Sequence, residues 1–306
     1  MNVKQLVVHL NPHLDELVAV WLLRNFGEKF FPGVSKAKLV TWGKKELEVN
    51  SLELALANGS LLVGLGGGMF DDHVHGECAA ILVAKRLGAS DDPSLKKLLN
   101  GVLIADSEAD GCLYWLAEEI KNLNRYWSGS VHVEALYERI QPFIFVQVAR
   151  QKEFLEARKL FDVRYKNRVC GVPVSAADAV DNPQYQHAAR AGGAKVIIQR
   201  NTHGLTQIFG CEDLNPFLLA MKVRKAELSM MHNGSRPSRF ISDEELLVKG
   251  TLSEIPQWCA DEPFLLNGSE SYPDVPPSRI NFRDLVQLVE KHIMETVNRN
   301  ERETKK

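Results

Sequence analysis

The chain has 306 residues, of which 45% are hydrophobic and 25% are charged. That balance is ordinary for a soluble globular protein, and the length allows two domains with a substantial core. A formal net charge of −2 at pH 7 argues against a nucleic-acid coat protein and against a membrane-surface binder. We expect no membrane partner, because no apolar run is long enough to span a bilayer and the N-terminus lacks the apolar core of a signal peptide. The five cysteines are widely spaced without a CxxC pair, which favours reduced thiols and a cytoplasmic protein.

The first predicted elements are a strand, a tight polar turn and a helix. A short apolar run spans Gln5–Val8, and the amphipathic segment Leu17–Leu23 follows a turn that contains Asn11 and Pro12. Asparagine is a common N-cap and proline a common first helical residue, so we expect the helix to begin at Pro12. The turn then holds polar side chains at the end of a strand, where ligands bind in open α/β sheets. These side chains are His9, His13 and Asp15.

Apolar runs and helical patterns continue to alternate through the first 125 residues, which predicts a parallel sheet covered by helices. The glycine turn at 66–68 would let the backbone pass close to a bound ligand. The run Val102–Ala105 is predicted as a strand that ends at Asp106. The other expected elements are strands at 37–42 and 60–65 and helices at 52–57, 77–87 and 93–100.

Three polar clusters follow apolar runs in this half of the chain. The first surrounds His9, the third is centred on Asp106, and the second comprises Asp71, Asp72, His73 and His75. Imidazole and carboxylate groups suit Mn²⁺, Zn²⁺, Fe²⁺ or Co²⁺, whereas structural zinc usually takes thiolates. The clusters therefore favour a shared metal site. The alternative is a set of ordinary loop residues, with Asp15 serving only the helix dipole and Asp71 or Asp72 forming a turn.

The second half of the chain has a different pattern. A long helical stretch at 131–161 should be kinked or divided by Pro142. Two apolar runs at 194–200 and 205–209 flank a polar turn and predict a β-hairpin. The remaining expectations are a helix at 216–229, a final helix at 282–297 and a charged, frayed tail from Asn298.

These patterns predict an α/β protein of two domains. A parallel-sheet domain would occupy residues 1–125, a helical connector residues 126–161, and a smaller α+β domain residues 162–306. Arg236 and Arg239 lie in a loop of that last segment, where a constrained pair of guanidinium groups would suit a phosphate. The loops around Trp258 and Tyr272 could stack a nucleic-acid base, although core packing is the usual role of tryptophan.

The H-x-N-P-x-x-D run at residues 9–15 resembles the first motif of the DHH phosphoesterase superfamily. Asp72-His73 resembles the start of its DHH motif, and Ile104–Ser107 resembles a later motif at which a strand ends in an aspartate. Histidine at position 13, followed by Asp15-Glu16, is closer to the melanocyte-proliferating-gene branch of metal-dependent, exonuclease-like proteins. The resemblance covers about the first 125 residues and implies a parallel-sheet metal-binding domain.

The resemblance implies a divalent metal, manganese first, with zinc, iron or cobalt as alternatives. Its ligands would be His9, His13, Asp15, Asp71, His73 and Asp106, and the catalytic residues would be Asp72, His73 and His75. The implied enzyme is a phosphohydrolase or phosphodiesterase whose partner is a nucleotide or short nucleic-acid substrate. Asn267, Gly268 and Ser269 would stand in for the glycine motif of the substrate domain. A homodimer is left open.

Two positions depart from the family pattern. Gly64 stands where an aspartate normally bridges two metals, and Val74 stands where the second histidine of DHH normally contacts the phosphate. Asp71 or Asp72 could supply the missing carboxylate from the neighbouring loop. The alternative function is therefore a catalytically degenerate member that binds a nucleotide or nucleic acid.

Overall fold

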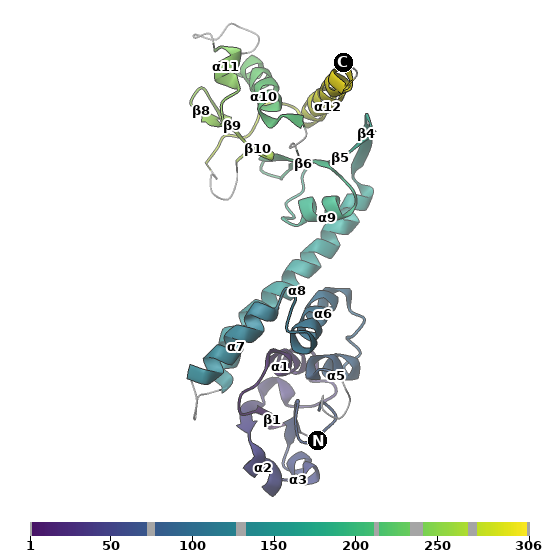
Figure 1. Ribbon diagram of the computed structural model, residues 1–306, viewed down its shortest axis with the longest axis vertical. Coiled ribbons are helices and arrows are strands. Elements are labelled where there is room, and N and C mark those ends of the chain that lie inside the picture. The colour runs from purple at the N-terminus through teal and green to yellow at the C-terminus, as the bar shows by residue number, and fades with distance from the viewer. Residues whose placement is uncertain are drawn as a thin grey trace. The chain divides into compact units, whose positions relative to one another are not determined.

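The computed structural model describes residues 2–71, 77–126, 133–210, 214–232, 241–268 and 274–304. Its contacts divide the chain into two compact units, residues 1–152 and 153–306 (Figure 1). The boundary falls inside helix α8 (Val133–Val163), within the segment that the sequence assigns to a connector. The chain is mixed α/β, with a three-stranded parallel sheet and a seven-stranded mixed sheet.

The sheet of unit 1 is parallel, as the alternation of strands and helices predicts. Its strands are β1 (Gln5–His9), β2 (Lys38–Trp42) and β3 (Ser60–Leu62), in the order β2-β1-β3. The middle strand is buried along Leu6, Val7 and Val8, which explains its continuous apolar run. In the register of β1 and β2, His9 is the partner of Trp42, so both strands end at the same level.

Helices surround this sheet, and one of them forms the centre of unit 1. Helix α1 (Leu14–Phe26) is buried on all sides from Leu14 to Leu23, because apolar residues occupy every face of its first turns. The other helical elements are η1 (Val34–Lys36), α2 (Lys44–Val49), α3 (Leu52–Ala57), α5 (Ala79–Arg86), α6 (Pro93–Ser107) and α7 (Tyr114–Tyr126). The predictions of helices at 52–57 and 77–87 are confirmed, the second with its start two residues late.

The predicted strand at Val102–Ala105 is wrong, because these residues continue α6. Asp92 caps this helix by accepting a hydrogen bond from the backbone N–H of Ser94 at 2.8 Å. Val102 and Ala105 are buried while Leu103 is 37% exposed, which is the spacing of one helix face. A short apolar run does not by itself separate strand from helix. Asp106 therefore lies in the last turn of a helix rather than at a strand end.

A division at Pro142 and a frayed tail from Asn298 are also corrected. Helix α8 runs through Pro142 as a single element. Pro142 is exposed, so water can solvate the carbonyl group that the proline leaves without a donor. The last helix, α12 (Phe282–Thr304), continues past Asn298 into the expected frayed tail, because the tail is rich in arginine and glutamate, which favour helix.

The sheet of unit 2 has the order β4-β5-β6-β7-β10-β9-β8, with only the β5–β6 pair parallel among the described strands. The predicted hairpin is confirmed as β6 (Val196–Arg200) and β7 (Thr206–Phe209). The other elements are β4 (Tyr165–Val169), β5 (Val172–Ala177), α9 (Tyr185–Ala191), α10 (Pro216–Met231), α11 (Asp243–Leu246), β8 (Gly250–Leu252), β9 (Ile255–Asp261) and β10 (Phe264–Asn267).

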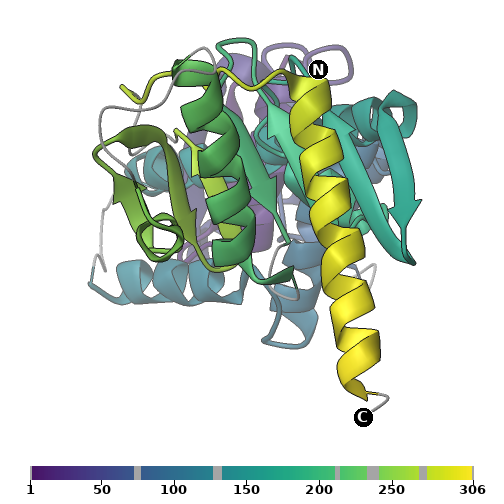
Figure 2. The ribbon, with the colours of Figure 1, turned by 90° about the horizontal axis from the view of Figure 1, so that it is seen from above.

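Both faces of this second sheet are covered. Helices α10 and α12 run across one face (Figure 2), where their apolar side chains pack with Ile198 and Ile208. Helix α9 and the end of α8 cover the other face, where Tyr185 and Phe161 pack with Ile197. The alternation of adjacent residues between the two cores is the period-two pattern of a strand. In the described part of the chain, no helix combines the length and apolarity that crossing a bilayer requires.

Candidate metal centre

The centre begins where β1 turns into α1. The helix starts at Leu14 with His13 as its N-cap, two residues later than the Asn11 cap predicts. The reason is Glu16, the third helical residue, whose Oε2 accepts a hydrogen bond from the backbone N–H of His13 at 2.9 Å. A glutamate at this position commonly closes the first turn of a helix. Because this cap fixes where the helix begins, it places His13 and Asp15 beside the end of β1.

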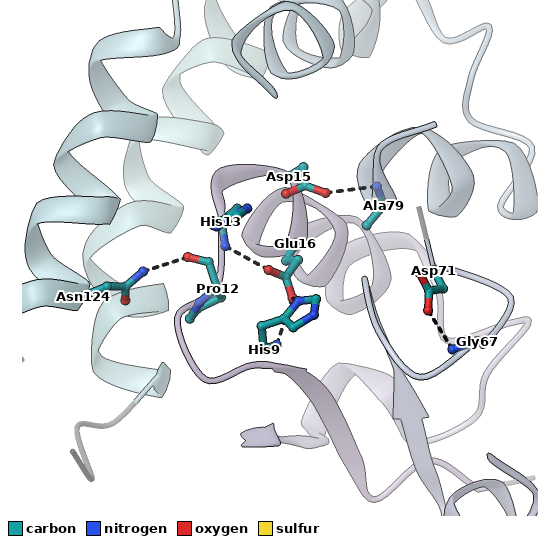
Figure 3. Close-up of polar contacts among 9 residues, drawn as sticks. All are labelled: His9, Pro12, His13, Asp15, Glu16, Gly67, Asp71, Ala79 and Asn124. Carbon is teal, nitrogen blue, oxygen red and sulfur yellow. Dashed lines mark hydrogen bonds and ion pairs between the residues drawn. The ribbon is translucent and has the colours of Figure 1, made fainter. Parts of the chain in front are cut away.

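Glu16 also fixes His9, the last residue of β1. Its Oε1 accepts from the backbone N–H of His9 at 2.9 Å and lies 3.0 Å from the ring Nδ1 (Figure 3). Glu16 is only 3% exposed, whereas the side chain of His9 is 41% exposed. When Nδ1–H donates to a carboxylate, the neutral ring carries its lone pair on Nε2. This is the arrangement in which histidine commonly ligates a metal.

The carboxylate of Glu16 lies beside Gly64, just after β3. An added Cβ at Gly64 would meet Cγ of Glu16 at 2.8 Å and its Oε1 at 3.1 Å, and the backbone φ of +76° also favours glycine. The resemblance expects an acidic side chain at residue 64. In this chain a carboxylate from α1 fills that volume instead.

Asp15 links α1 to α5. Its Oδ2 accepts a hydrogen bond from the backbone N–H of Ala79, the first residue of α5, at 3.1 Å. The residue is 4% exposed, so its carboxyl group is held inside the protein. One potential ligand atom from each of His13, Asp15 and Glu16 lies within 4.8 Å of the others. For Asp15, the bond to Ala79 and metal ligation are compatible, because its carboxylate has two oxygens.

Asp106 reaches the same centre from the last turn of α6. It lines one cavity together with His9, His13 and Asp15. Burial raises the pKa of the Cys78 thiol to about 12, and the negative charges of Asp15 and Asp106 add to this effect. Both carboxylates therefore lie close enough to act on one thiol. A carboxylate at the negative end of a helix is electrostatically unfavourable unless positive charge offsets it.

The cavity has a volume of about 850 Å³ and belongs entirely to unit 1. A smaller cavity of about 110 Å³ adjoins it on the α6 and α7 side, where Asp15, Asp106 and Lys121 are among the lining residues. Lys121 makes an ion pair with Glu118 at 2.8 Å. The residues around the larger cavity are His9, Leu10, Asn11, His13, Asp15, Glu16, Trp42, Gly43, Lys44, Leu47, Glu48, Gly64 and Asp106.

Asp71 is the described member of the second predicted cluster, and it has a different position. Asp71 is buried and accepts a hydrogen bond from the backbone N–H of Gly67 at 2.6 Å. Figure 3 shows its carboxylate directed at the glycine turn rather than toward His13 and Asp15. This contact supports the turn-forming alternative, and Glu16 rather than Asp71 stands next to Gly64. The predictions for Asp72, His73, Val74 and His75 concern residues outside the described ones.

The predicted substrate residues of the second half are only partly described. Asn267 is fully buried, and its amide group bonds with the carbonyls of Gln257 and Pro276 and with the N–H of Ser278. These bonds argue for a structural role rather than substrate contact. Gly268 follows the last residue of β10 with a φ of +77°. Arg236, Arg239, Ser269 and Tyr272 lie outside the described residues.

Trp258 does not offer a face to a base. It is fully buried, and its indole N–H donates to Oε2 of Glu227 at 2.9 Å. Core packing, the usual role of tryptophan, is therefore its role here. The sequence also left two contributors to the centre unassigned, Glu16 and Trp42. The signal for Glu16 was its position three residues after His13, which is the spacing of a capping box.

The donor set fits a divalent cation. It combines imidazole nitrogens with carboxylate oxygens, which suits first-row transition metals. The buried carboxylates of Asp15 and Glu16 also accept hydrogen bonds from backbone N–H groups. No family model, curated protein or solved structure matches the chain.

Proposed function

We propose that unit 1 is the catalytic unit of a metal-dependent phosphoesterase that hydrolyses a phosphodiester in a nucleotide or short oligonucleotide. The observation that carries the proposal is the gathering of His9, His13, Asp15 and Asp106 around one cavity at the end of β1. These residues come from two separate stretches of sequence, 9–15 and the end of α6, so their convergence is a property of the fold. The resemblance of the first motif to DHH phosphoesterases supplies the reaction class.

The cation is manganese or a similar divalent metal, with zinc, iron or cobalt as alternatives. The described residues that line the cavity offer nitrogen and oxygen donors, and no cysteine is among them. Soft thiolate ligands select zinc and copper, whereas carboxylates suit manganese. The chemistry of the donor set therefore favours the harder ion.

Each side chain of the candidate metal centre would have a separate role in hydrolysis. A bound divalent cation supplies polarisation of a phosphoryl oxygen and a lowered pKa for a water molecule. His9, His13, Asp15 and Asp106 hold the cation, and Glu16 holds the His9 ring with Nε2 as its acceptor. Lys44, which is exposed at the cavity, supplies positive charge to an anionic substrate.

The second candidate is a degenerate member that binds a nucleotide without hydrolysing it. The observation that favours it is the use of both Glu16 oxygens by the protein itself. Oε1 accepts from His9 and Oε2 accepts from His13. A carboxylate committed in this way is a weaker bridge between two cations than the aspartate expected at residue 64. A single cation would bind phosphate yet activate water less well.

Hydrolysis by manganese-loaded protein tests the proposal, with a dinucleotide and a generic phosphodiester as substrates. Asp15→Asn and Asp106→Asn should each lower turnover by about 100-fold or more, since a charged ligand is lost. Asp15→Asn keeps an oxygen for the Ala79 N–H, so the helix contact survives. Asp91→Asn, at an exposed aspartate of the same unit, is the matched control. Unchanged turnover in the first two variants contradicts the proposal, and nucleotide binding without turnover in the wild type favours the second candidate.

A further inference from the structure

The cavity extends beyond the candidate metal centre along the end of the parallel sheet. His9 and Trp42 are register partners on β1 and β2. Register partners of neighbouring parallel strands lie about 4.8 Å apart and point to the same face of the sheet. Both residues line the cavity. The indole of Trp42 is therefore the immediate neighbour of His9 on the side away from Gly64.

The Trp42 side of the cavity has an apolar wall. Trp42 and Leu47 are half-buried and pack on the small core under the sheet, which fixes them in place. Leu10 completes the wall and is 61% exposed. A Cβ added at Gly43 would stand 2.7 Å from Cδ1 of Leu10, so the leucine lies closely over this glycine. An exposed leucine held against glycine, beside an indole, provides apolar surface to a ligand.

The two ends of the cavity differ in charge and polarity. One end carries imidazoles and carboxylates, and the other carries the apolar wall. Lys44 lies at the apolar end, where its side chain is 90% exposed and its Nζ is 3.9 Å from Glu48. An exposed pair at this distance is weak, so the ammonium group adds positive charge to the cavity for an anionic ligand, without contacting the phosphoryl position at the His9 end. A matching ligand has a phosphoryl group joined to a flat apolar group.

We infer that Trp42, Leu10 and Leu47 form a base-binding subsite for a nucleotide whose phosphoryl group lies at the His9 end of the cavity. The inference rests on the proposed function for the position of the phosphoryl group. The volume of about 850 Å³ is within the range of small-molecule sites. An indole face binds flat heteroaromatic rings of any sequence, because every base has a π-face. The subsite therefore selects the presence of a base rather than its identity.

Binding of AMP and of ribose 5-phosphate to the manganese-loaded full chain tests the subsite. Both ligands carry the same sugar and phosphoryl group, and only AMP carries a base. We expect wild type to bind AMP more tightly by on the order of ten-fold, the size of one stacked base. Trp42→Ala should abolish that preference, whereas Trp42→Phe should keep most of it. Trp115→Ala is the matched control, because Trp115 is exposed on α7 and does not line the cavity.

Two further readouts keep the test decisive if Trp42→Ala fails to fold. Leu10→Ala removes the exposed part of the wall and should also reduce the preference for AMP. AMP should quench tryptophan fluorescence in wild type and leave that of Trp42→Phe unchanged. Equal affinity of wild type for the two ligands, or no binding of either, overturns the subsite.

The result also separates the subsite from the proposed reaction. A preference for AMP that depends on Trp42, without hydrolysis of any phosphodiester, supports the subsite and contradicts the phosphoesterase. Hydrolysis that is insensitive to the presence of a base and to Trp42→Ala supports the phosphoesterase and overturns the subsite.

Discussion

The side chain of Glu16 occupies the space next to Gly64, so that a Cβ at residue 64 would stand 2.8 Å from Cγ of Glu16. The same carboxylate bonds to the backbone of both His9 and His13. One buried acidic group thus replaces the side chain expected just after β3, and it orders the turn that carries the candidate ligands. A carboxylate at residue 64 and Glu16 in its present position are mutually exclusive.

Substitution of Gly64 by alanine should destabilise the protein more than the same change at Gly67. Both glycines have positive φ values, of +76° and +68°, so the backbone strain is similar. A Cβ at Gly67 meets nothing within 4 Å, whereas one at Gly64 meets Glu16. We expect Gly67→Ala to cost about 1–2 kcal/mol and Gly64→Ala about 1–3 kcal/mol more, by urea unfolding. Equal losses would show that Glu16 moves aside freely.

Glu16→Gln should weaken metal binding without removing a proposed ligand. The amide has a single oxygen, which cannot replace both carboxylate oxygens at His9 and His13. Loss of the contact to Nδ1 frees the His9 ring to change its tautomer, and such outer contacts are typically worth about 10- to 100-fold in metal affinity. Manganese titration measures the effect. Glu46→Gln is the control, because Glu46 makes the same capping contact to Gly43 on α2. If Glu16→Gln binds manganese with the affinity of wild type, Glu16 does not contribute to the metal centre.

The buried thiol of Cys78 should cause the free energy of unfolding to decrease at alkaline pH. Burial, with Asp15 and Asp106, raises the pKa of its thiol from 9.0 to about 12. The unfolded chain releases this proton near pH 9, whereas the folded chain retains it. The protonated thiol therefore makes its full contribution to the free energy of unfolding below pH 9, and that contribution is lost as pH rises toward 12. The difference in unfolding free energy between wild type and Cys78→Ala should therefore shrink over this range. A constant difference would mean that the thiol titrates normally.

Asn267→Ala should act on stability rather than on ligand binding. Its buried amide group makes bonds to Gln257, Pro276 and Ser278, and the substitution leaves their polar atoms without partners. We expect a loss of about 2–4 kcal/mol in unfolding free energy. AMP affinity at temperatures where the variant is folded should equal that of wild type. A specific loss of AMP affinity in the folded variant would restore Asn267 as a substrate residue.

The sequence predicts the framework of unit 1 more securely than its ligand geometry. The parallel strands and the helix at 52–57 follow from apolar periodicity and from turn residues, which are local signals. Asp106 was assigned to a strand end because the apolar run before it suits either structure. Its helical position depends on which faces are buried, and that is a tertiary property.

Glu16 illustrates the other limit of the sequence. A glutamate three residues after a cap is common in helices and carries no functional signal by itself. Its role follows from the approach of Gly64 and His9, which β3 and β1 bring together from distant parts of the sequence. The helix start was misplaced for the same reason, since the carboxylate of Glu16 selects His13 over Asn11 as the cap.

The most direct test of the central claim is manganese binding by equilibrium dialysis, with the bound metal counted by elemental analysis. The account predicts at least one bound ion per chain in wild type and an affinity lower by on the order of ten-fold or more in Asp15→Asn and in Asp106→Asn. Asp91→Asn should bind as wild type does, and affinity should fall as pH is lowered because imidazoles must be neutral to ligate. Absence of binding by wild type, or equal binding by all three variants, would contradict a metal centre at the end of β1.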